Sequence, residues 1–474
     1  MSSKLLSIES IDILGTIPQY YALVGGFLVL WLVWVIAKRR YSSNNNRRTP
    51  DDDEVERKLS NWYPEPLIPE VSSSKKVPVE YEVPRRVTTR VGKRIVVEGV
   101  DCLNLATHNY LGFADSPKIQ ENAVAAIRKY GVGSCGPRGF YGTVDVHLEL
   151  EERLAQFMEA EEAIVYSYGF SAIASAIPAY CKRRDIVYAD EKVNFAIQKG
   201  LDASRSTVKY FRHNDPTDLE RLLKEQAQKD SKDAKKATKV RRFLIAEGIF
   251  MNTGLVCPLP QLVELCEKYK LRIFLDESIS IGTLGNKGRG VTEHFNVPRH
   301  KIDMIMGSLE WSLSSIGGFC CGSSFVIEHQ RLSGLGYCFS ASLPPLLTVA
   351  ATTALDMMEL EPEIFLTLKK NCVAIDAGLR KMNFFEISGF NESPIKHIFI
   401  KETFERTKEN QILDKISEKC IENGLAVIKS AYLNTEREIP RPSLRITVSV
   451  LLNKEDIDFF LKTLENCTKQ VLPL

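Results

Sequence analysis

Residues 303–318, DMIMGSLEWSLSSIGG, contain a short apolar run that leads through polar residues into a glycine pair. Roughly 27 residues earlier, another apolar run, RIFLDE at 272–277, ends in two acids. Two short apolar runs at this spacing predict successive strands of an α/β sheet. Ligands of such sheets bind beyond the carboxyl ends of the strands, so the two runs predict a cofactor site.

The segment resembles the α-oxoamine synthases, a family of fold-type I pyridoxal-phosphate enzymes. The family motif is close to D-I-M-M-G-T-F-T-K-S-F-G-x-x-G-G, and an ungapped match puts the family lysine on Trp311. Only a primary amine can hold pyridoxal phosphate as a Schiff base, and an indole has none. The resemblance therefore implies that this chain alone does not carry out the reaction. A chance match would leave an ordinary buried strand and turn.

Two further positions depart from the family pattern around the cofactor ring. Asp276 stands where the family aspartate pairs with the pyridine nitrogen, but Ile279 replaces the histidine that contacts the phenolic oxygen. In DEKVNFAIQKG, which starts at residue 190, Asn194 replaces the histidine that stacks on the ring. Asp276, Asn194, Ile279 and Trp311 are therefore predicted to form a vestigial cofactor pocket.

A strand–turn–helix pattern at residues 163–173, AIVYSYGFSAI, follows the family order as well. In the family, the residues of this turn bind the cofactor phosphate with the amides of a helix N-terminus. Ser167, Tyr168 and Gly169 stand there in this chain. The resemblance implies that some phosphate affinity is retained at this turn.

The loop GVGSCGPRGFYGT, residues 131–143, contains a literal G-x-G-x-x-G. It follows a predicted helix and not a strand, so the dinucleotide-binding interpretation fails. In the resembled family the matching loop lies at the dimer interface beside the active site. The resemblance implies that Gly133, Arg138, Phe140 and Tyr141 help to complete the site of a partner subunit. The alternative is a plain turn between two helices.

Two motifs nearer the C-terminus also match the family. YCFSASLPP, residues 337–345, resembles a segment whose hydroxyls reach across the dimer, which assigns that role to Ser340 and Ser342; a simple Ser/Pro turn is the alternative. PSLRITVSV, residues 442–450, places Arg445 at the arginine that grips the amino-acid carboxylate in the family, and a purely structural role is the alternative.

The N-terminal part has an uncharged stretch from about residue 20 to residue 37 with Tyr20, Tyr21, Trp31 and Trp34 in it. Its length just suffices for a transmembrane helix with interfacial aromatics. A cleaved signal peptide is the competing interpretation, but the run starts late and lacks a small-residue cleavage pattern. Basic residues follow the stretch, which predicts that the bulk of the protein faces the cytosol.

Composition excludes several classes of protein. The chain of 474 residues is 44% hydrophobic and 26% charged with a net charge of +2, which is typical of a globular protein with a large core. No basic tract with interleaved aromatics points to nucleic acid. The eleven cysteines lack metal-ligand spacing, so we expect reduced thiols and no metal site.

The predicted fold class is α/β, with a fold-type I (aspartate aminotransferase-like) large domain built on a mostly parallel sheet, a small α+β C-terminal domain and an N-terminal transmembrane helix. The predicted divisions are a membrane anchor with a basic flank at 1–50, an arm or linker at 51–100, the large domain at 101–355 and the small domain at 356–474.

With its anchor and missing lysine, the chain resembles the lysine-free subunit of the family's heterodimeric members. That resemblance implies an endoplasmic reticulum complex that condenses L-serine with palmitoyl-CoA to 3-oxosphinganine, releasing carbon dioxide and CoA. Pyridoxal phosphate would be held covalently by a lysine-bearing long-chain-base subunit 2. Small activating subunits, ORM-like regulators and the bilayer are the other implied partners. A catalytically inert membrane scaffold and a self-sufficient homodimeric α-oxoamine synthase are the alternatives.

Overall fold

The computed structural model describes residues 19–45, 51–64 and 84–472. The chain falls into two compact units, residues 1–83 and residues 84–474. The first unit contains the helices α1 (Gln19–Asn45) and α2 (Asp52–Ser60). Residues 1–18 of the predicted anchor and residues 65–83 of the predicted arm lie outside the described residues.

Helix α1 includes the whole of the predicted membrane segment, residues 20–37. Its side chains are described from Val24 to Lys38, and the large apolar ones among them, such as Phe27 and Leu30, are exposed except for the half-buried Val35. Among the described residues, no helix combines the length and the apolar character needed to span a bilayer. The transmembrane helix predicted over residues 20–37 includes residues whose side chains lie outside that set, and it stays a prediction.

The second unit is built on a seven-stranded sheet with the order β3-β9-β8-β7-β6-β4-β5. All neighbouring pairs are parallel except those that β9 makes with β3 and β8. Most of its central strand residues are buried, as expected when helices cover both faces of a sheet. The strands are β3 (Glu162–Tyr166), β4 (Ile186–Asp190), β5 (Thr207–Phe211), β6 (Arg242–Glu247), β7 (Arg272–Asp276), β8 (Met304–Ser308) and β9 (Gly318–Gly322).

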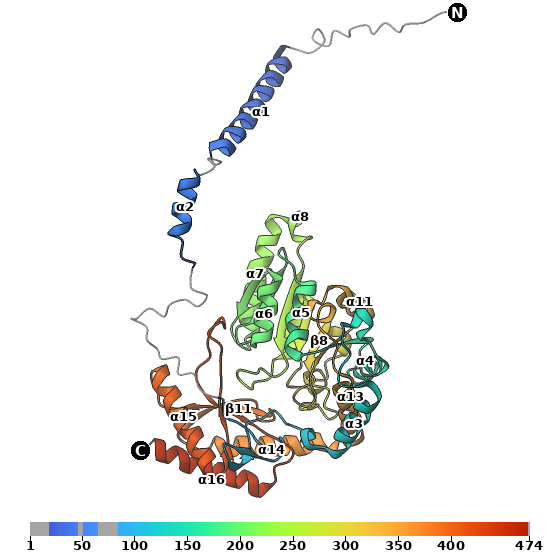
Figure 1. The fold of residues 1–474 in the computed structure, drawn as a ribbon, viewed down its shortest axis with the longest axis vertical. Coiled ribbons are helices and arrows are strands. Elements are labelled where there is room, and N and C mark those ends of the chain that lie inside the picture. The colour runs from blue at the N-terminus through green and yellow to red at the C-terminus, as the bar shows by residue number, and fades with distance from the viewer. Residues whose placement is uncertain (1–18, 46–50, 65–83, 473–474) are drawn as a thin grey trace, which may run out of the picture. The chain divides into compact units, whose positions relative to one another are not determined.

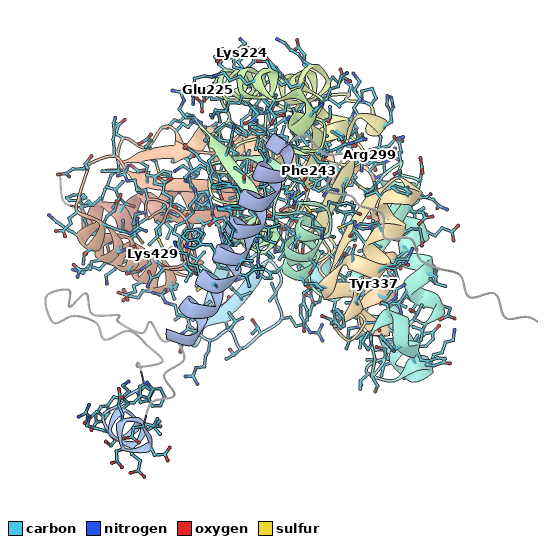
Figure 2. The ribbon with its side chains drawn as sticks, turned by 90° about the horizontal axis from the view of Figure 1, so that it is seen from above. Lys224, Glu225, Phe243, Arg299, Tyr337 and Lys429 are labelled. Carbon is cyan, nitrogen blue, oxygen red and sulfur yellow. The ribbon has the colours of Figure 1, made fainter. Side chains whose placement is uncertain are left out.

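Helices surround this sheet. Helices α3, α4 and α13 pack together, and α5 packs on α6, β8 and β9 (Figure 1). On α7, Lys224 and Glu225 point into solvent (Figure 2). The helices are α3 (Pro117–Tyr130), α4 (Asp145–Phe157), α5 (Gly169–Tyr180), α6 (Phe195–Ser204), α7 (Pro216–Lys232), α8 (Ala234–Ala237), α9 (Leu259–Tyr269), α10 (Val291–His294), α11 (Ser324–Ser333), α12 (Leu335–Cys338) and α13 (Pro345–Leu360).

The close approach of α5 to the sheet depends on the glycine pair of the 303–318 segment. A Cβ on Gly318 would lie 2.7 Å from the Cα atom of Gly169 and 2.7 Å from the Cβ atom of Ala172. Because neither backbone nor methyl group can yield that far, only glycine lets the first turn of α5 rest on β9. The pair therefore fixes where the N-terminus of α5 lies.

The C-terminal part is an antiparallel four-stranded sheet, β10-β11-β14-β13, which lies with α14 and α16 (Figure 1). Its strands are β10 (Phe385–Ser388), β11 (Ile395–Ile400), β13 (Ile428–Lys429) and β14 (Leu444–Thr447), and its helices are α14 (Glu363–Leu379), α15 (Arg406–Glu422) and α16 (Lys454–Val471). Helix α16 contacts both α14 and α15.

A third, three-stranded sheet joins distant parts of the chain. The hairpin β1 (Arg94–Val97) and β2 (Val100–Asn104) pairs through β2 with β12 (Leu425–Ala426). The predicted domain boundary at residue 101 falls inside this hairpin. Segments about 320 residues apart thus share one small sheet, a pairing that no local pattern predicts.

Candidate functional site

Two carboxylates lie at the carboxyl ends of adjacent strands, on Glu247 of β6 and Asp276 of β7. Their residues are register partners in the parallel pair, and both are 2% exposed. Burial raises the pKa of Asp276 above its usual value. Burial and the neighbouring charge of Asp276 raise the pKa of Glu247 well above its own. Burial thus disfavours the charged form of both acids, and for Glu247 the charge of its neighbour adds to this effect.

Asn194 connects these acids to helix α6. Its side-chain Nδ2 donates to the Asp276 carboxylate at 2.8 Å, and its backbone N–H donates to Glu247 at 2.7 Å. Its Oδ1 accepts from the N–H of Ile197 at 3.1 Å and so caps α6. The second oxygen of Asp276 accepts from the N–H of Ser278 at 2.9 Å. Both oxygens of the acid predicted to face a pyridine nitrogen therefore have donors from the chain itself.

Trp311 is half-buried in the loop after β8, where its indole stacks on the ring of His108 with centroids 5.1 Å apart and planes at 28°. The Nδ1 atom of His108 bonds the Tyr110 hydroxyl at 2.5 Å. Burial lowers the pKa of His108 well below its usual value, and the charges of Arg445 and His397 add to that effect, so the ring is neutral. An aromatic contact thus occupies the position that the resemblance assigns to the family lysine.

The turn predicted to bind phosphate is occupied by protein groups. The Ser167 hydroxyl donates to the carbonyl oxygen of Ala341, and the Tyr168 side chain is 60% exposed. The N–H of Gly169, the first residue of α5, donates to the carboxylate of Glu310 at 3.3 Å. A negative charge thus lies where the resemblance placed the phosphate group.

These residues do not fit pyridoxal phosphate. Trp311 offers no amine, the Asp276 carboxylate is bonded to Asn194, and Glu310 lies against the helix N-terminus that a phosphate needs. Ile279, at the position where the resemblance expects a histidine, is a buried apolar side chain with 2% exposure. Asp276 ends β7, and the other three predicted pocket residues lie in the loops and turns that follow β4, β7 and β8. Asn194 and Asp276 are hydrogen-bonded to each other.

A buried ion pair between Arg138 and Glu151 anchors the base of the 131–143 loop. Arg138 is 6% exposed and bonds Glu151 of α4 with both guanidinium ends, at 2.8 and 3.0 Å. Its Nε donates to the Thr143 hydroxyl at 2.9 Å, and its guanidinium carbon lies 5.4 Å from the ring centre of Tyr337. Arg138 therefore supports the loop from inside, with its charge already paired.

The tip of this loop is open to solvent. Phe140 is 72% exposed, Tyr141 is fully exposed, and Gly133 is exposed as well. Tyr141 has a φ of 61°, a left-handed conformation that is unfavourable for a bulky residue and that the surrounding turn imposes. Two exposed aromatic rings on an anchored, strained turn are characteristic of a contact surface.

Ser342 and Ser340 differ in their surroundings. Ser342 is buried, and its hydroxyl bonds the Ser134 hydroxyl and the carbonyl oxygen of Gly142, both at 2.5 Å. It therefore ties the 337–345 segment to the 131–143 loop. Ser340 is half-buried next to the exposed Phe339, so of the two serines it has the more accessible side chain.

Arg445 of β14 is half-buried opposite His397 of β11. Burial lowers its pKa, and its Nε has no hydrogen-bond partner within the described chain. An arginine with free donors beside His108 and Tyr110 is compatible with the carboxylate contact that the resemblance implies.

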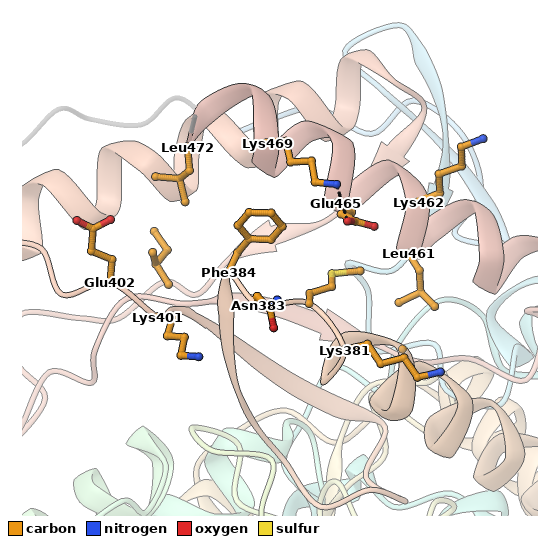
Figure 3. Close-up of a pocket in the computed structure, with 13 residues that line it drawn as sticks. Lys381, Asn383, Phe384, Lys401, Glu402, Leu461, Lys462, Glu465, Lys469 and Leu472 are labelled. Atoms are coloured by element: carbon orange, nitrogen blue, oxygen red, sulfur yellow. Dashed lines mark ion pairs between the residues drawn. The ribbon is translucent and has the colours of Figure 1, made fainter. Parts of the chain in front are cut away.

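Cavities occur elsewhere in the described chain. One of about 1020 Å³ lies in the C-terminal part between α14, α16 and β11, where Lys381, Lys401 and Lys462 surround apolar side chains such as Phe384 and Leu461 (Figure 3). Another of about 780 Å³ is lined by residues such as Tyr180, Phe274 and Arg299. None of the predicted pocket residues lines either cavity, and no cluster of metal ligands occurs among the described residues.

Three residues of this site were not predicted. Glu310 precedes Trp311 directly, so its charge was visible in the sequence, but its reach to α5 depends on the sheet. His108 lies in the sequence THNYLG at residues 107–112, and Glu247 ends an apolar run. Glu247 could have been predicted, because it is an acid at the end of an apolar run that precedes the similar run ending at Asp276.

Comparison with known proteins assigns the family. The model for aminotransferase class I and II matches residues 100–464. Serine palmitoyltransferase 1 of Dictyostelium discoideum is 39% identical over 97% of this chain and 95% of its own length. The chain belongs to this serine palmitoyltransferase 1 family. Long chain base biosynthesis protein 1b of Oryza sativa subsp. japonica is 38% identical over 95% of this chain and 92% of its own length. The family resemblance found in the sequence is confirmed.

Solved structures confirm the predicted fold-type I architecture. A serine palmitoyltransferase variant from S. paucimobilis with a bound PLP–myriocin aldimine superposes with a TM-score of 0.73 at 24% identity, covering 82% of this chain and 93% of that one. The enzyme from Sphingomonas wittichii gives the same TM-score, with 82% and 92% covered. The mostly parallel sheet and the separate C-terminal sheet follow that fold.

Glu277, which follows Asp276, provides a test of the electrostatics at this edge of the sheet. It is fully buried, accepts from the N–H of Val291 at 3.0 Å and from the Ser280 hydroxyl, and burial raises its pKa to about 7. A folded-state pKa above the unfolded value gives stability below the unfolded pKa that is lost as pH rises through the folded pKa.

We therefore expect Glu277→Gln to remove a pH-dependent loss of stability. Between about pH 4.5 and pH 7, the wild type should lose up to about 3 kcal/mol of unfolding free energy relative to the variant, because each pKa unit is worth about 1.4 kcal/mol. Chemical denaturation of both proteins at several pH values measures this difference. A difference that stays constant across this range contradicts the assignment.

Proposed function

We propose that this chain is the subunit without the cofactor lysine of a heterodimeric serine palmitoyltransferase. The complex condenses L-serine with palmitoyl-CoA to 3-oxosphinganine, carbon dioxide and CoA, the first step of sphingolipid biosynthesis. Similarity to serine palmitoyltransferase 1 proteins along nearly the whole chain supports the enzyme. One observation supports the assignment of the cofactor to the other subunit: Trp311, an indole stacked on His108, stands where the reaction needs an amine.

In this proposal the partner, a long-chain-base subunit 2, holds pyridoxal phosphate through its own lysine. This chain stabilises the partner and completes its active site from across the interface. The support is the 131–143 loop, whose core is locked by the Arg138–Glu151 pair while Phe140 and Tyr141 remain exposed. Ser340, beside the exposed Phe339, is the second candidate contact with the partner site.

The proposal also places the complex at the endoplasmic reticulum membrane, with residues 20–37 as a single anchor and the large C-terminal part in the cytosol. The exposed apolar side chains of α1 from Val24 to Ile36 support an anchor, since water does not favour them. An acyl chain and a long-chain product partition into lipid, so a membrane location brings the site to its substrate. Small activating subunits and ORM-like regulators complete the proposed assembly.

The central test is co-expression with a lysine-bearing homologue. We expect the purified chain alone to give no 3-oxosphinganine from serine and palmitoyl-CoA, and the co-purified pair to give turnover that is lost when the lysine of the partner is replaced. A product assay by mass spectrometry checks both. Turnover by the isolated chain, or covalent trapping of the cofactor on one of its own lysines, supports a homodimeric synthase instead.

The loop tip gives a second test. Tyr141→Ala and Phe140→Ala should leave the melting temperature of the isolated chain unchanged, because these side chains pack little in it. In the heterodimer each should weaken association or lower turnover by about tenfold or more, as aromatic residues at interface centres do. Phe459→Ala on α16, with 41% exposure of the ring, is the matched control. Unchanged assembly and turnover in both tip variants would favour an inert scaffold.

The anchor gives a third test. Deleting residues 1–45 should release the chain from membranes into the supernatant after a carbonate wash when it is expressed without its partner. Replacing Leu30 and Val33 with Asp should do the same, since charges at the centre of a membrane helix cost about 2.5–3.5 kcal/mol each. Retention of both variants in the membrane pellet contradicts a single anchor.

A further inference from the structure

The three contacts that a phosphorylated pyridoxal would need in this chain are all replaced by contacts within the chain. Trp311 stacks on His108, Asn194 donates to Asp276, and Glu310 accepts from the N-terminus of α5. With Trp311, no covalent bond to the cofactor can form. With Asn194, the carboxylate that would contact the pyridine ring is already hydrogen-bonded. The third replacement has a different consequence, because it concerns the group that carries most of the charge of the cofactor.

The N-terminus of α5 is suited to an anion. Helix α5 has 12 residues, its N-cap Tyr168 makes no side-chain cap, and its first turn contains no acidic residue. The amides of such a terminus and the helix dipole favour a negative charge. Glu310 supplies that charge from a distant part of the chain, through the bond from the N–H of Gly169.

The position of Glu310 is set by the backbone around it. Its own N–H donates to the Ser308 hydroxyl at 3.1 Å, and Leu309 donates to the carbonyl oxygen of Gly317 at 2.9 Å. The Ser308 hydroxyl lies 2.7 Å from where a Cβ on Gly169 would be, so the loop and the helix are in direct contact. The carboxylate is thus held beside α5 by the same short loop that carries Trp311.

We propose that Glu310 is a built-in anion that fills the phosphate-binding end of α5 and excludes phosphorylated cofactors from this chain, independently of the missing lysine. A phosphate dianion brought to the same amides would meet a carboxylate of like charge and would have to displace its hydrogen bond. Restoring an amine at position 311 is therefore insufficient to restore cofactor binding. For the same reason, we expect this turn to have no residual affinity for phosphate.

This inference extends the proposed function, in which the partner alone holds the cofactor, but it is measured on the purified full-length chain without the partner. Its failure therefore leaves the heterodimer proposal standing. The variants are E310Q, which removes the charge and keeps an acceptor oxygen, and E310T, which also removes the reach to α5. The control is E361Q, which neutralises an exposed glutamate just after α13.

Isothermal titration with pyridoxal 5′-phosphate, and with pyridoxal as the phosphate-free probe, gives the readout. We expect E310Q and E310T to bind pyridoxal 5′-phosphate at least about tenfold more tightly than the wild type and E361Q, with pyridoxal unchanged in all four proteins. Equal affinity of the folded variants and the wild type for pyridoxal 5′-phosphate overturns the proposal. So does a gain that pyridoxal shows equally.

A covalent labelling experiment tests a lysine introduced at position 311 directly. After incubation with pyridoxal 5′-phosphate and borohydride reduction, W311K should carry little label at position 311, and W311K/E310T should carry about tenfold more. Strong labelling of W311K alone overturns the proposal. Melting temperatures and circular dichroism establish that each variant is folded. If E310T is unfolded, E310Q and W311K/E310Q decide the outcome, because glutamine retains the bond to Gly169.

Discussion

The parallel pairing of β6, β7 and β8 is the constraint on which the rest of this site depends. In this register Glu247 lies opposite Asp276, and Asp276 lies opposite Met306, so the three strands end at one edge of the sheet. Everything that follows each strand must then share a small volume. Two acids, the 309–317 loop and the N-termini of α5 and α6 meet there, and their charges must be satisfied without water.

The chain satisfies those charges with its own groups. Asn194 bridges Asp276 and Glu247 while capping α6, and Glu310 completes the N-terminus of α5. A buried charge left without a partner costs far more than a paired one contributes, so these internal hydrogen bonds are needed to keep the acids buried. In the proposed heterodimer, the contribution of this chain therefore comes from the surface that it offers to its partner.

That surface is centred on the 131–143 loop, which has a buried, hydrogen-bonded base and an exposed aromatic tip. Arg138 and Glu151 form a buried bidentate pair at the base of the 131–143 loop, and Ser342 ties the loop to the 337–345 segment. Phe140 and Tyr141 stand exposed on the same loop, with Tyr141 in a left-handed conformation. A rigid base with a strained aromatic tip loses little entropy on binding, which suits a loop that enters the active site of a partner. The resemblance assigned Arg138 to the interface together with the tip, but the structure gives it the supporting position.

The sequence by itself determined the fold class and placed an indole where the resemblance expects a lysine. The apolar runs at 272–277 and 303–318 are local signals of buried strands, and the identity of Trp311 is chemical information that no folding can alter. Only the tertiary structure decided what replaced the cofactor contacts. Glu310 and Gly169 are 141 residues apart, and Asn194 and Asp276 are 82 apart. Hydrogen bonds over such separations depend on which strands become neighbours in the sheet, and local patterns along the chain do not specify that order.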